Sequence, residues 1–386
     1  MISLVIALLA LATLLTIAYG TTRSWPHHDR TPPVTVVVCA RDEEATLFDC
    51  LMALATQDYP HDHYRLILVD HLSQDATGEI METFAENAPV PTRVIHISEE
   101  DPQLAGKVHA LAVGLEHVET ELVLLTDGDC IVPDSWIRAM VSYFEEDVVA
   151  VAGLVSVGLD GIPEDWIGRL QNVDHRYYLG MLTGLSGLRA PSGRRKRDRI
   201  PQPFRSLISR LRPAFCSGNN LGFRMSAYRE VGGYRAIGNT FIEDYALLNR
   251  IVSRTRKHLA VVPDSAVRVF TTAQPDLRGL WRQKRRWATG TSIFNPLSAY
   301  LFIEVGMIRI LLPWLVLFQP LPALAALALV AAADTIVIRN VSRLTGHRIY
   351  LRDILFHEIY QIALNHMLLL ATITHWPVVW KGQKYR

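Results

Sequence analysis

The sequence has few cysteines and no excess of charge of one sign, and each shortage excludes a class of protein. Its four cysteines, Cys39, Cys50, Cys130 and Cys216, are widely spaced and form no CxxC or zinc pattern. Reduced thiols in a cytosolic domain are therefore expected rather than a disulfide framework. Lysine and arginine number 39 against 38 aspartates and glutamates, which gives no nucleic-acid signature. No internal repeat is visible.

Long apolar runs are present instead, and one of them opens the chain. Residues Ile2–Tyr19 are almost wholly apolar, about the length that crosses a bilayer, and Arg23 and Arg30 follow them. The positive-inside rule then predicts a membrane anchor over residues 1–22, with the N-terminus outside and the bulk of the chain in the cytoplasm. A cleaved signal peptide is the alternative, but the basic n-region of such peptides is missing.

Residues 299–386 predict a C-terminal transmembrane region of two to three helices. Leu301–Phe318 and Leu321–Ile338 are apolar and meet at a Gln-Pro-Leu-Pro turn. The stretch Ile359–Val379 either spans the membrane or lies at its surface. Residues 276–298 combine basic side chains with tryptophan and leucine, which predicts an amphipathic interfacial helix. We therefore expect an integral membrane protein, at the bacterial inner membrane, whose catalytic domain is cytoplasmic.

Residues 33–275 alternate between short apolar runs and helical patterns. Strands are predicted at Thr35–Ala40, Leu66–Asp70, Arg93–Ile97, Leu122–Thr126 and Val148–Val157, and helices at Glu44–Thr56, Ala76–Asn87, Lys107–Val118 and Trp166–Leu188. Leu259–Thr271 suggests two antiparallel strands. This order predicts an α/β fold with a mostly parallel, doubly wound sheet, in which ligands bind at the carboxyl ends of the strands.

A basic segment at residues 189–212 interrupts this domain and contains one acid, Asp198. One interpretation is a solvated loop. The other is a flexible segment that lies on anionic lipid headgroups, with Phe204 and Leu207 on its apolar face. Aromatic residues are not interleaved with the basic ones, so single-stranded nucleic acid is not indicated.

Acids follow several of the predicted strands. Asp42 and Asp70 lie at or just past the first two strand ends, and the stretch LLTDGDCIVPDSW places Asp127 and Asp129 after a buried strand. Such an Asp-Gly-Asp triplet is often only a turn. Two carboxylates at a strand end also suit a hard divalent cation that bridges phosphate oxygens.

Other motifs follow in a fixed order. They are VVVCARDEEATLFDCLMALATQDYP, LILVDHLSQDATGEI, GKVHAL, LLTDGDC, SGNNLGFRMSAYREVGGYR, FIEDYAL and QKRRW. This set resembles the family 2 inverting glycosyltransferases of the GT-A fold over about residues 33–290, two-thirds of the chain. The resemblance implies a GT-A catalytic domain, with a Rossmann-like and mostly parallel sheet, between N- and C-terminal transmembrane helices.

The resemblance also implies a nucleotide-sugar site. Asp42 and Asp70 would hold the base and ribose of the donor, and Lys107 would approach it as a positive charge. Asp127 and Asp129 match the DXD pair of the family, which binds Mn²⁺ or Mg²⁺ and so neutralises the departing diphosphate. Helix capping, turn formation and simple solvation are the alternative roles for Asp42, Asp70 and Lys107.

The later motifs are assigned to catalysis and to the acceptor. Asp244 of the Glu243-Asp244 pair would be the base that deprotonates the acceptor hydroxyl, and Glu243 would tune its pKa. Acids that complement a helix dipole are the other interpretation. The QxxRW and SGNN motifs supply the remaining candidates: Gln283 and Arg286 at the diphosphate, and Trp287, Asn219 and Asn220, with Ser217 and Gly218, at the acceptor. A satisfied polar turn is the alternative for SGNN, and snorkelling arginines at an interface for QxxRW.

The leading hypothesis is a metal-dependent glycosyltransferase that moves a sugar from a nucleotide sugar, expected to be a UDP-sugar, to a membrane lipid with inversion, as in glycolipid synthesis. A processive polysaccharide synthase is the alternative, and a non-enzymatic nucleotide-binding scaffold is the third hypothesis. The sequence departs from many relatives at Asp70-His71-Leu72, where they have a second acid. The single histidines His109, His175 and His258 show no ligand spacing.

Overall fold

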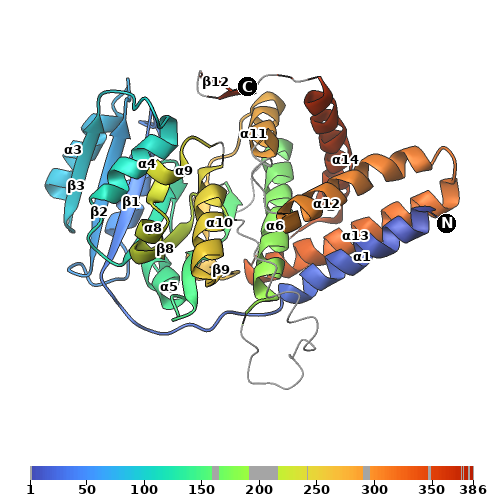
Figure 1. Ribbon diagram of the computed structural model, residues 1–386, viewed down its shortest axis with the longest axis horizontal. Helices are drawn as coiled ribbons and strands as arrows, with labels where there is room; N and C mark the ends of the chain where they lie inside the picture. Colours follow the sequence, from blue (N-terminus) through green and yellow to red (C-terminus); the bar gives the residue numbers. More distant parts are fainter. Residues whose placement is uncertain are drawn as a thin grey trace. The chain divides into compact units, whose positions relative to one another are not determined.

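The computed structural model describes residues 2–158, 165–190, 216–240, 242–289, 296–346, 349–374, 376, 378–380 and 383–385. The chain forms two compact units, neither of which is continuous in sequence. Ser24–Leu159 and Arg189–Thr272 make the sheet unit, and Met1–Arg23, Asp160–Leu188 and Ala273–Arg386 make the helical unit (Figure 1).

The sheet unit is built on seven strands in the order β3-β2-β1-β4-β8-β6-β9. They are β1 (Val34–Ala40), β2 (Tyr64–His71), β3 (Thr92–Ile97), β4 (Leu122–Asp127), β6 (Val148–Ala152), β8 (Leu221–Arg224) and β9 (His258–Val261). The first four strands pair in parallel, β8 is antiparallel to both of its neighbours, and β6 and β9 are parallel. The mostly parallel α/β sheet predicted from the sequence is confirmed.

Helices and a small second sheet complete this unit. The helices are α2 (Leu47–Ala55), α3 (Thr77–Asn87), α4 (Gly106–Glu116), α5 (Trp136–Ser142), α8 (Met225–Glu230), α9 (Gly233–Ile237) and α10 (Glu243–Thr255). The small sheet consists of β5 (Cys130–Ile131), β10 (Val269–Thr271) and β7 (Val155–Val157), in that order. The four cysteines are free thiols.

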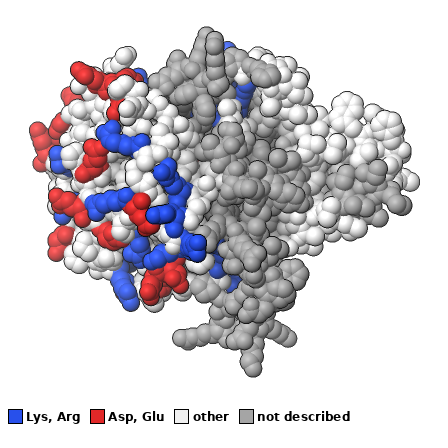
Figure 2. Space-filling view, in the orientation of Figure 1, with Lys and Arg blue, Asp and Glu red and all other residues white. Residues whose placement is uncertain are grey.

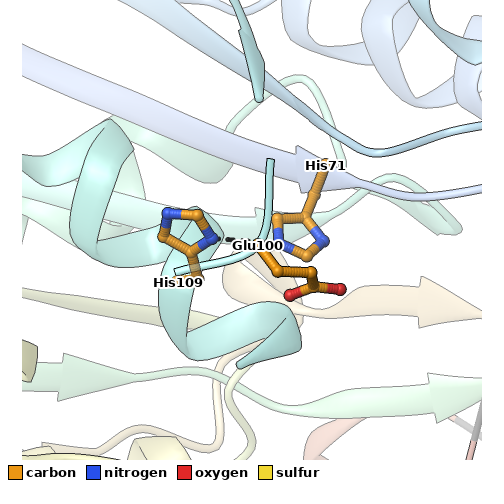
Figure 3. Close-up of side chains that lie close together, drawn as sticks. All are labelled: His71, Glu100 and His109. Atoms are coloured by element: carbon orange, nitrogen blue, oxygen red, sulfur yellow. Dashed lines mark hydrogen bonds between the residues drawn. The ribbon is translucent and has the colours of Figure 1, made fainter. Parts of the chain in front are cut away.

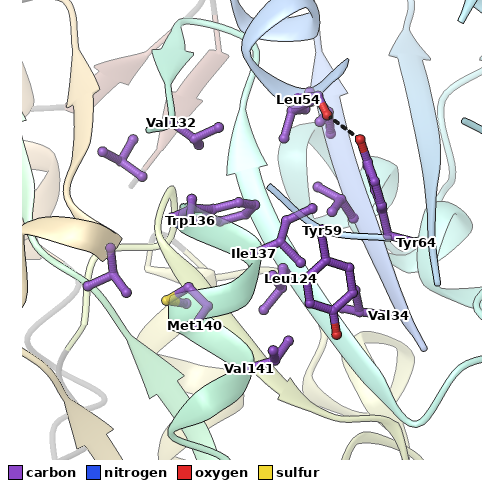
Figure 4. Packing of buried hydrophobic residues seen from close by; sticks show 14 of the residues in the cluster. Val34, Leu54, Tyr59, Tyr64, Leu124, Val132, Trp136, Ile137, Met140 and Val141 are labelled. Carbon is purple, nitrogen blue, oxygen red and sulfur yellow. Dashed lines mark hydrogen bonds between the residues drawn. The ribbon is translucent and has the colours of Figure 1, made fainter. Parts of the chain in front are cut away.

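Strand β1 is covered on both faces, which explains its continuous apolar run. Val36 and Val38 belong to a core cluster with Leu47 and other residues of α2. Val37 points to the opposite face, where helix α4 packs against it through Gly114; a Cβ added there would lie 3.0 Å from the Cγ1 atom of Val37. Figure 4 shows the core cluster around the fully buried Trp136 of α5.

The prediction of two antiparallel strands over Leu259–Thr271 is wrong. β9 extends the main sheet beside β6, whereas β10 joins the small sheet and pairs with β7 in parallel and with β5 antiparallel. The reason lies between them. The carboxylate of Asp264 accepts from the backbone N of Ala266 at 2.9 Å and opens a 3₁₀ turn, Ser265–Val267, that redirects the chain.

The helical unit contains the predicted helix after residue 165 together with both ends of the chain. Its elements are α1 (Ile2–Gly20), α6 (Trp166–Gly187), α11 (Leu277–Thr289), α12 (Pro296–Leu315), α13 (Pro320–Leu344), α14 (Leu351–Ile373) and a short hairpin of β11 (Val378–Trp380) and β12 (Gln383–Tyr385). Helix α6 belongs to this unit, although the sequence pattern placed it within the catalytic domain 33–275.

Helices α1, α6 and α13 pack so closely that glycines are needed. A Cβ on Gly184 of α6 would lie 2.3 Å from the backbone oxygen of Ile17, and one on Gly180 would lie 2.3 Å from the Cγ1 atom of Val337. Leu14 of α1 is 2% exposed and belongs to a cluster with Val330 of α13. Helix α1 is therefore an integral part of this bundle.

The surface of the helices is strongly apolar. Among the described side chains, exposed large apolar residues occur on the second half of α12, on α13 and α14, and in the turn between α12 and α13. They include Trp314, Phe318, Leu321, Leu351, Phe356, Ile359 and Ile373. The buried side is polar in places: Arg309 of α12 and Asp334 of α13 form an ion pair inside the bundle. On the face in Figure 2, charges of both signs are interspersed over the sheet unit, and the visible described surface of α12 and α13 carries almost none.

Two helices in the described part of the chain, α13 and α14, are long and apolar enough to cross a membrane. Leu8–Gly20 and Gly306–Leu315 are shorter apolar helices. The predicted span Leu321–Ile338 corresponds to the larger part of α13. The predicted apolar stretch that begins at Ile359 corresponds to the larger part of α14. Most of the basic segment 189–212 lies outside the described residues.

Candidate active site

The acids predicted to meet at one edge of the sheet do so. In the register of the strands, Asp70 at the end of β2 lies opposite Ala40, and Asp127 at the end of β4 lies opposite Cys39. Both acids therefore flank the carboxyl end of β1, roughly 10 Å apart across two strand spacings. Leu221 of the antiparallel β8 lies opposite Leu125, which brings the residues just before β8 to the same edge.

Lys107 joins two of the motifs through its ammonium group. Its Nζ atom donates to Oδ1 of Asp127 at 2.5 Å and lies 3.7 Å from Oε1 of Glu243. Burial alone would lower the pKa of Lys107, but the carboxylates of Asp127, Glu243 and Asp244 outweigh it and raise that pKa above the usual lysine value. Lys107 is therefore cationic at neutral pH, and its ion pairs connect Asp127 of β4 with Glu243 of α10.

Asp129 has no such cation. Its Oδ2 accepts from the Oγ1 atoms of Thr271 at 3.3 Å and Thr272 at 3.5 Å, and Oδ1 from the Sγ of Cys130 at 3.3 Å. Burial, and then the Asp127 carboxylate, raise the pKa of Asp129. The charge of Lys107 acts in the opposite direction but offsets this rise only in part. Among the described residues no lysine, arginine or histidine forms an ion pair with it. A partly buried carboxylate pair whose second member has no ion-pair partner among the described residues fits a divalent cation, with Asp129 as the first ligand and Asp127 beside it.

Gly128 is required between the two acids for a steric reason. A Cβ at this position would lie 2.4 Å from Oε2 of Glu43, 3.1 Å from the Cβ of Ala40 and 3.2 Å from the Cδ1 of Leu47. The triplet thus turns directly over the end of β1 and the residues that follow it. Glu43 was not singled out from the sequence, although it lies in the ARDEE motif.

Asp42 and Asp70 are tied to one another through the loop after β2. Asp42 has a left-handed backbone with φ of 54°, and its Oδ1 accepts from the backbone N of Gln74 at 2.8 Å. Ser73 connects the two acids: its Oγ accepts from the backbone N of Asp42 at 3.2 Å, and its own N donates to Oδ1 of Asp70 at 3.3 Å. His96 also contacts Asp70, at 3.0 Å from Oδ2. Both acids therefore have loop-forming roles, and their contact with a nucleotide stays a prediction.

The Glu243-Asp244 pair opens helix α10, as predicted. Glu243 is 9% exposed and faces Lys107, whereas the carboxyl group of Asp244 lies against Gly218, where a Cβ would be 3.1 Å from Oδ2. Burial, with Asp244 and Glu243 nearby, raises the pKa of the Cys216 thiol well above its usual value, so this thiol is protonated beside Asp244. Asp244 therefore sits on the same edge as the DXD pair.

The two asparagines of the SGNN motif differ. Asn219 is partly exposed, accepts from the Oγ of Ser217 at 2.7 Å and donates to the Sγ of Cys130 at 3.3 Å, beside Asp129. Asn220 is fully buried: it accepts from Trp136 at 2.9 Å and donates to two backbone oxygens at 2.7 Å. Its amide is satisfied inside the fold, so Asn220 has a structural role and is not carried into the acceptor site proposed below.

Gln283, Arg286 and Trp287 belong to the helical unit, on α11. The ring of Trp287 packs edgewise against Tyr178 of α6, with centroids 6.5 Å apart, and the Nζ of Lys284 lies 4.3 Å from the Trp287 ring centroid. Lys284 is 3% exposed and forms an ion pair with Asp174 of α6. One side of α11 is therefore held against α6 through Lys284, and the interfacial position predicted for this helix stays a prediction.

Comparison with known families finds two matches. Residues 32–290 match glycosyltransferase-like family 2, and residues 206–386 match glycosyl transferase family 21. Among curated proteins, the probable glycosyltransferase YdaM of Bacillus subtilis is 24% identical over 67% of this chain and 55% of its own length. The β-monoglucosyldiacylglycerol synthase of Synechocystis is 29% identical over 29% of this chain and 23% of its own length.

The fold has a solved counterpart. The mannosyltransferase PcManGT of Pyrobaculum calidifontis, solved with GDP-Man and Mn²⁺, superposes with a TM-score of 0.59 at 18% identity, covering 97% of this chain and 99% of the other. That likeness shows a shared GT-A-like fold. The chain spans about half or less of the length of the curated relatives it matches. Since the first family match covers more than half of the 386 residues, the chain belongs to glycosyltransferase-like family 2.

Proposed function

We propose that the protein is an inverting glycosyltransferase that moves a sugar from a nucleoside-diphosphate sugar to the hydroxyl group of a membrane lipid. The observation that carries this proposal is the group of acids at one sheet edge. Lys107 forms ion pairs with Asp127 and Glu243, whereas the hydrogen-bond donors to Asp129 are neutral, so the group keeps an excess of negative charge. Such an edge suits a diphosphate that arrives with a cation.

The proposed step uses the protein's own residues as follows. Asp244 takes the proton of the acceptor hydroxyl, and the resulting oxygen attacks the anomeric carbon from the face opposite the diphosphate. The bond from that carbon to the diphosphate oxygen breaks, and the nucleoside diphosphate leaves with the electron pair. Glu243 stays paired with Lys107, so its influence on Asp244 is electrostatic.

Mn²⁺ or Mg²⁺ is the proposed cofactor, held by Asp129 with Asp127. When bound, it neutralises charge on the departing diphosphate. Asp127 already has Lys107 as a partner, which favours Asp129 as the direct ligand. The Mn²⁺ in the mannosyltransferase structure supports this proposal by fold likeness. Asp42 and Asp70 for the nucleotide, Gln283 and Arg286 for the diphosphate, and Trp287 and Asn219 for the acceptor stay predictions from the family resemblance.

A membrane acceptor is proposed from the helical unit. Helices α13 and α14 are long enough to span a bilayer, and α12 to α14 expose large apolar side chains such as Trp314 and Phe356. Apolar surface of this extent favours contact with lipid. The charged groups Arg309 and Asp334 are paired inside the bundle, which is where membrane proteins place them. We propose that α1 and α12 complete the membrane region.

Product analysis tests the proposal. Membranes that contain the protein are incubated with labelled GDP-mannose, UDP-glucose and UDP-N-acetylglucosamine in turn, and the products are separated into organic-soluble and polymeric fractions. Membranes with the Asp244→Asn variant are the control. We expect label from one donor in the organic phase only with the unaltered protein. Label in a polymer would favour the processive synthase, and equal label in both membranes would contradict the proposal.

A further inference from the structure

Two buried histidines meet at the carboxyl end of β2, next to Asp70 in the sequence. His71 is the last residue of β2, and His109 lies on the first turn of α4; they are 3% and 7% exposed. The Nε2 atom of His71 is 3.3 Å from the Nδ1 atom of His109, and the rings are nearly perpendicular, at 89° (Figure 3). His71 lies within the motif LILVDHLSQDATGEI and His109 within GKVHAL, but the proposed reaction gives neither side chain a role.

Glu100 joins the two histidines from the loop between β3 and α4. One oxygen of its carboxylate and one nitrogen of each imidazole all lie within 4.8 Å of one another. The Glu100 side chain is 47% exposed, and its Oε1 is 3.7 Å from the guanidinium of Arg41. The group therefore has two buried nitrogen donors and one carboxylate that opens to solvent.

The spacing of the nitrogens matches a tetrahedral metal. With zinc–nitrogen bonds of about 2.0–2.1 Å and tetrahedral angles, two imidazole nitrogens lie roughly 3.3 Å apart. The observed 3.3 Å equals that value. A direct hydrogen bond between two neutral imidazoles has a similar length. The metal site and the simple hydrogen bond are therefore distinguished by whether the carboxylate of Glu100 contributes to metal binding.

We propose that His71, His109 and Glu100 form a site for a zinc-like transition-metal ion, with water in the fourth position. Two imidazoles and one carboxylate suit Zn²⁺ or Co²⁺ rather than Mg²⁺, which prefers oxygen ligands. The pair of acids at Asp127 and Asp129 offers oxygen ligands only, so the two sites are chemically distinct.

The location gives the ion a structural role. It would join three segments that are far apart in sequence, namely the end of β2, the loop that carries Glu100 and the start of α4. Lys107 precedes His109 by two residues on α4, and Asp70 directly precedes His71. An ion here would therefore brace the segments that present Asp70 and Lys107.

Metal binding by the purified full-length protein tests the proposal. The protein is stripped with a chelator, titrated with Co²⁺ and followed by visible d–d absorption, and Zn²⁺ is then added as a competitor. The titration is done in the Asp129→Asn background, so that ions bound at the acids do not contribute. Glu100→Gln is compared with Glu99→Gln, which makes the same change at the adjacent exposed acid.

We expect one Co²⁺ per chain in a tetrahedral spectrum, displaced by Zn²⁺ and not by Mg²⁺. Affinity should fall at least tenfold with Glu100→Gln and His109→Asn and stay unchanged with Glu99→Gln. Thermal melts without metal establish that each variant is folded. Absence of a tetrahedral spectrum, or equal affinity of Glu100→Gln and Glu99→Gln, would show that the histidines form only a hydrogen bond. Either result leaves the proposed transfer reaction untouched, because no step of it uses these residues.

Discussion

The Nζ atom of Lys107 lies 2.5 Å from Oδ1 of Asp127, which connects the first turn of α4 to the end of β4. The same ammonium group faces Glu243 at 3.7 Å. One cation thus pairs with two acids, whereas Asp129 forms no ion pair among the described residues and is our proposed ligand for a divalent metal ion. This distribution of charge underlies the first two predictions.

Lys107→Met should destabilise the sheet unit and weaken donor binding. Removal of one partner of a buried ion pair leaves uncompensated carboxylates, but the Lys107 side chain is 33% exposed, so we expect a cost of about 1–2 kcal/mol rather than the full buried value. Urea unfolding measures the cost. Lys257→Met, at a lysine that donates to a backbone oxygen, is the control and should change stability little. Equal stability of the two variants would contradict the role given to Lys107.

Chelation of the metal and the Asp129→Asn substitution should both weaken binding of the nucleotide-sugar donor. With EDTA, the affinity for a nucleotide sugar should fall by about tenfold or more, because the diphosphate loses its counter-ion. Mn²⁺ or Mg²⁺ should restore binding in the unaltered protein but not in Asp129→Asn. The exposed Asp134→Asn serves as the matched control. Donor binding that is indifferent to EDTA would remove the metal role from the DXD pair.

His96 makes the stability of the sheet unit depend on pH. Its ring nitrogens lie 3.0 Å from Asp70 and 2.8 Å from Glu82, and these hydrogen bonds raise the pKa of His96 above its usual 6.5. Because the folded-state pKa is the higher one, the stabilisation is fully present below about pH 6.5 and is lost as pH rises through the folded-state value.

The corresponding experiment compares His96→Gln with the unaltered protein in urea unfolding at several pH values. The variant should be less stable at about pH 5.5, and the difference should shrink toward about pH 9. His117→Gln is the control for loss of a histidine. A difference that grows with pH would have the opposite sign and would show that the carboxylates do not hold His96 in its charged form.

The ion pair of Lys284 and Asp174 should dominate the stability of α11 in the helical unit. The two side chains are 3% and 1% exposed, so Lys284→Met or Asp174→Asn alone leaves a buried charge and should cost about 3–5 kcal/mol. The double variant should recover much of this loss. Thermal unfolding in detergent measures it. Strictly additive losses in the double variant would show that the two residues do not stabilise one another.

The sheet could be predicted because its strands are indicated by short runs of neighbouring residues. Val36 to Val38 form an apolar run that only a strand buried on both faces needs, and the acids after each strand reach a common edge once the strands are parallel. The site could be predicted to the extent that its acids follow strands or open a helix, as Asp127 and Glu243 do.

The other features of the site depend on contacts between residues far apart in the sequence, which hydrophobic periodicity does not predict. His71 and His109 meet across 38 positions of sequence, and Lys107 finds Glu243 through the fold alone. Two short apolar runs after residue 258 do not reveal whether they pair together, and they join different sheets. The burial of Asn220 and of Lys284 likewise follows from tertiary packing that a polar residue type does not reveal.

Donor binding and sugar transfer measured side by side for Asp244→Asn test the central claim most directly. If the acids at the sheet edge divide the work between donor binding and proton removal, the variant should bind the nucleotide sugar within about threefold of normal and lose transfer by at least a thousandfold. Asp276→Asn, an acid of the helical unit at the start of α11, is the control and should keep both activities. Transfer that survives in Asp244→Asn would contradict the account.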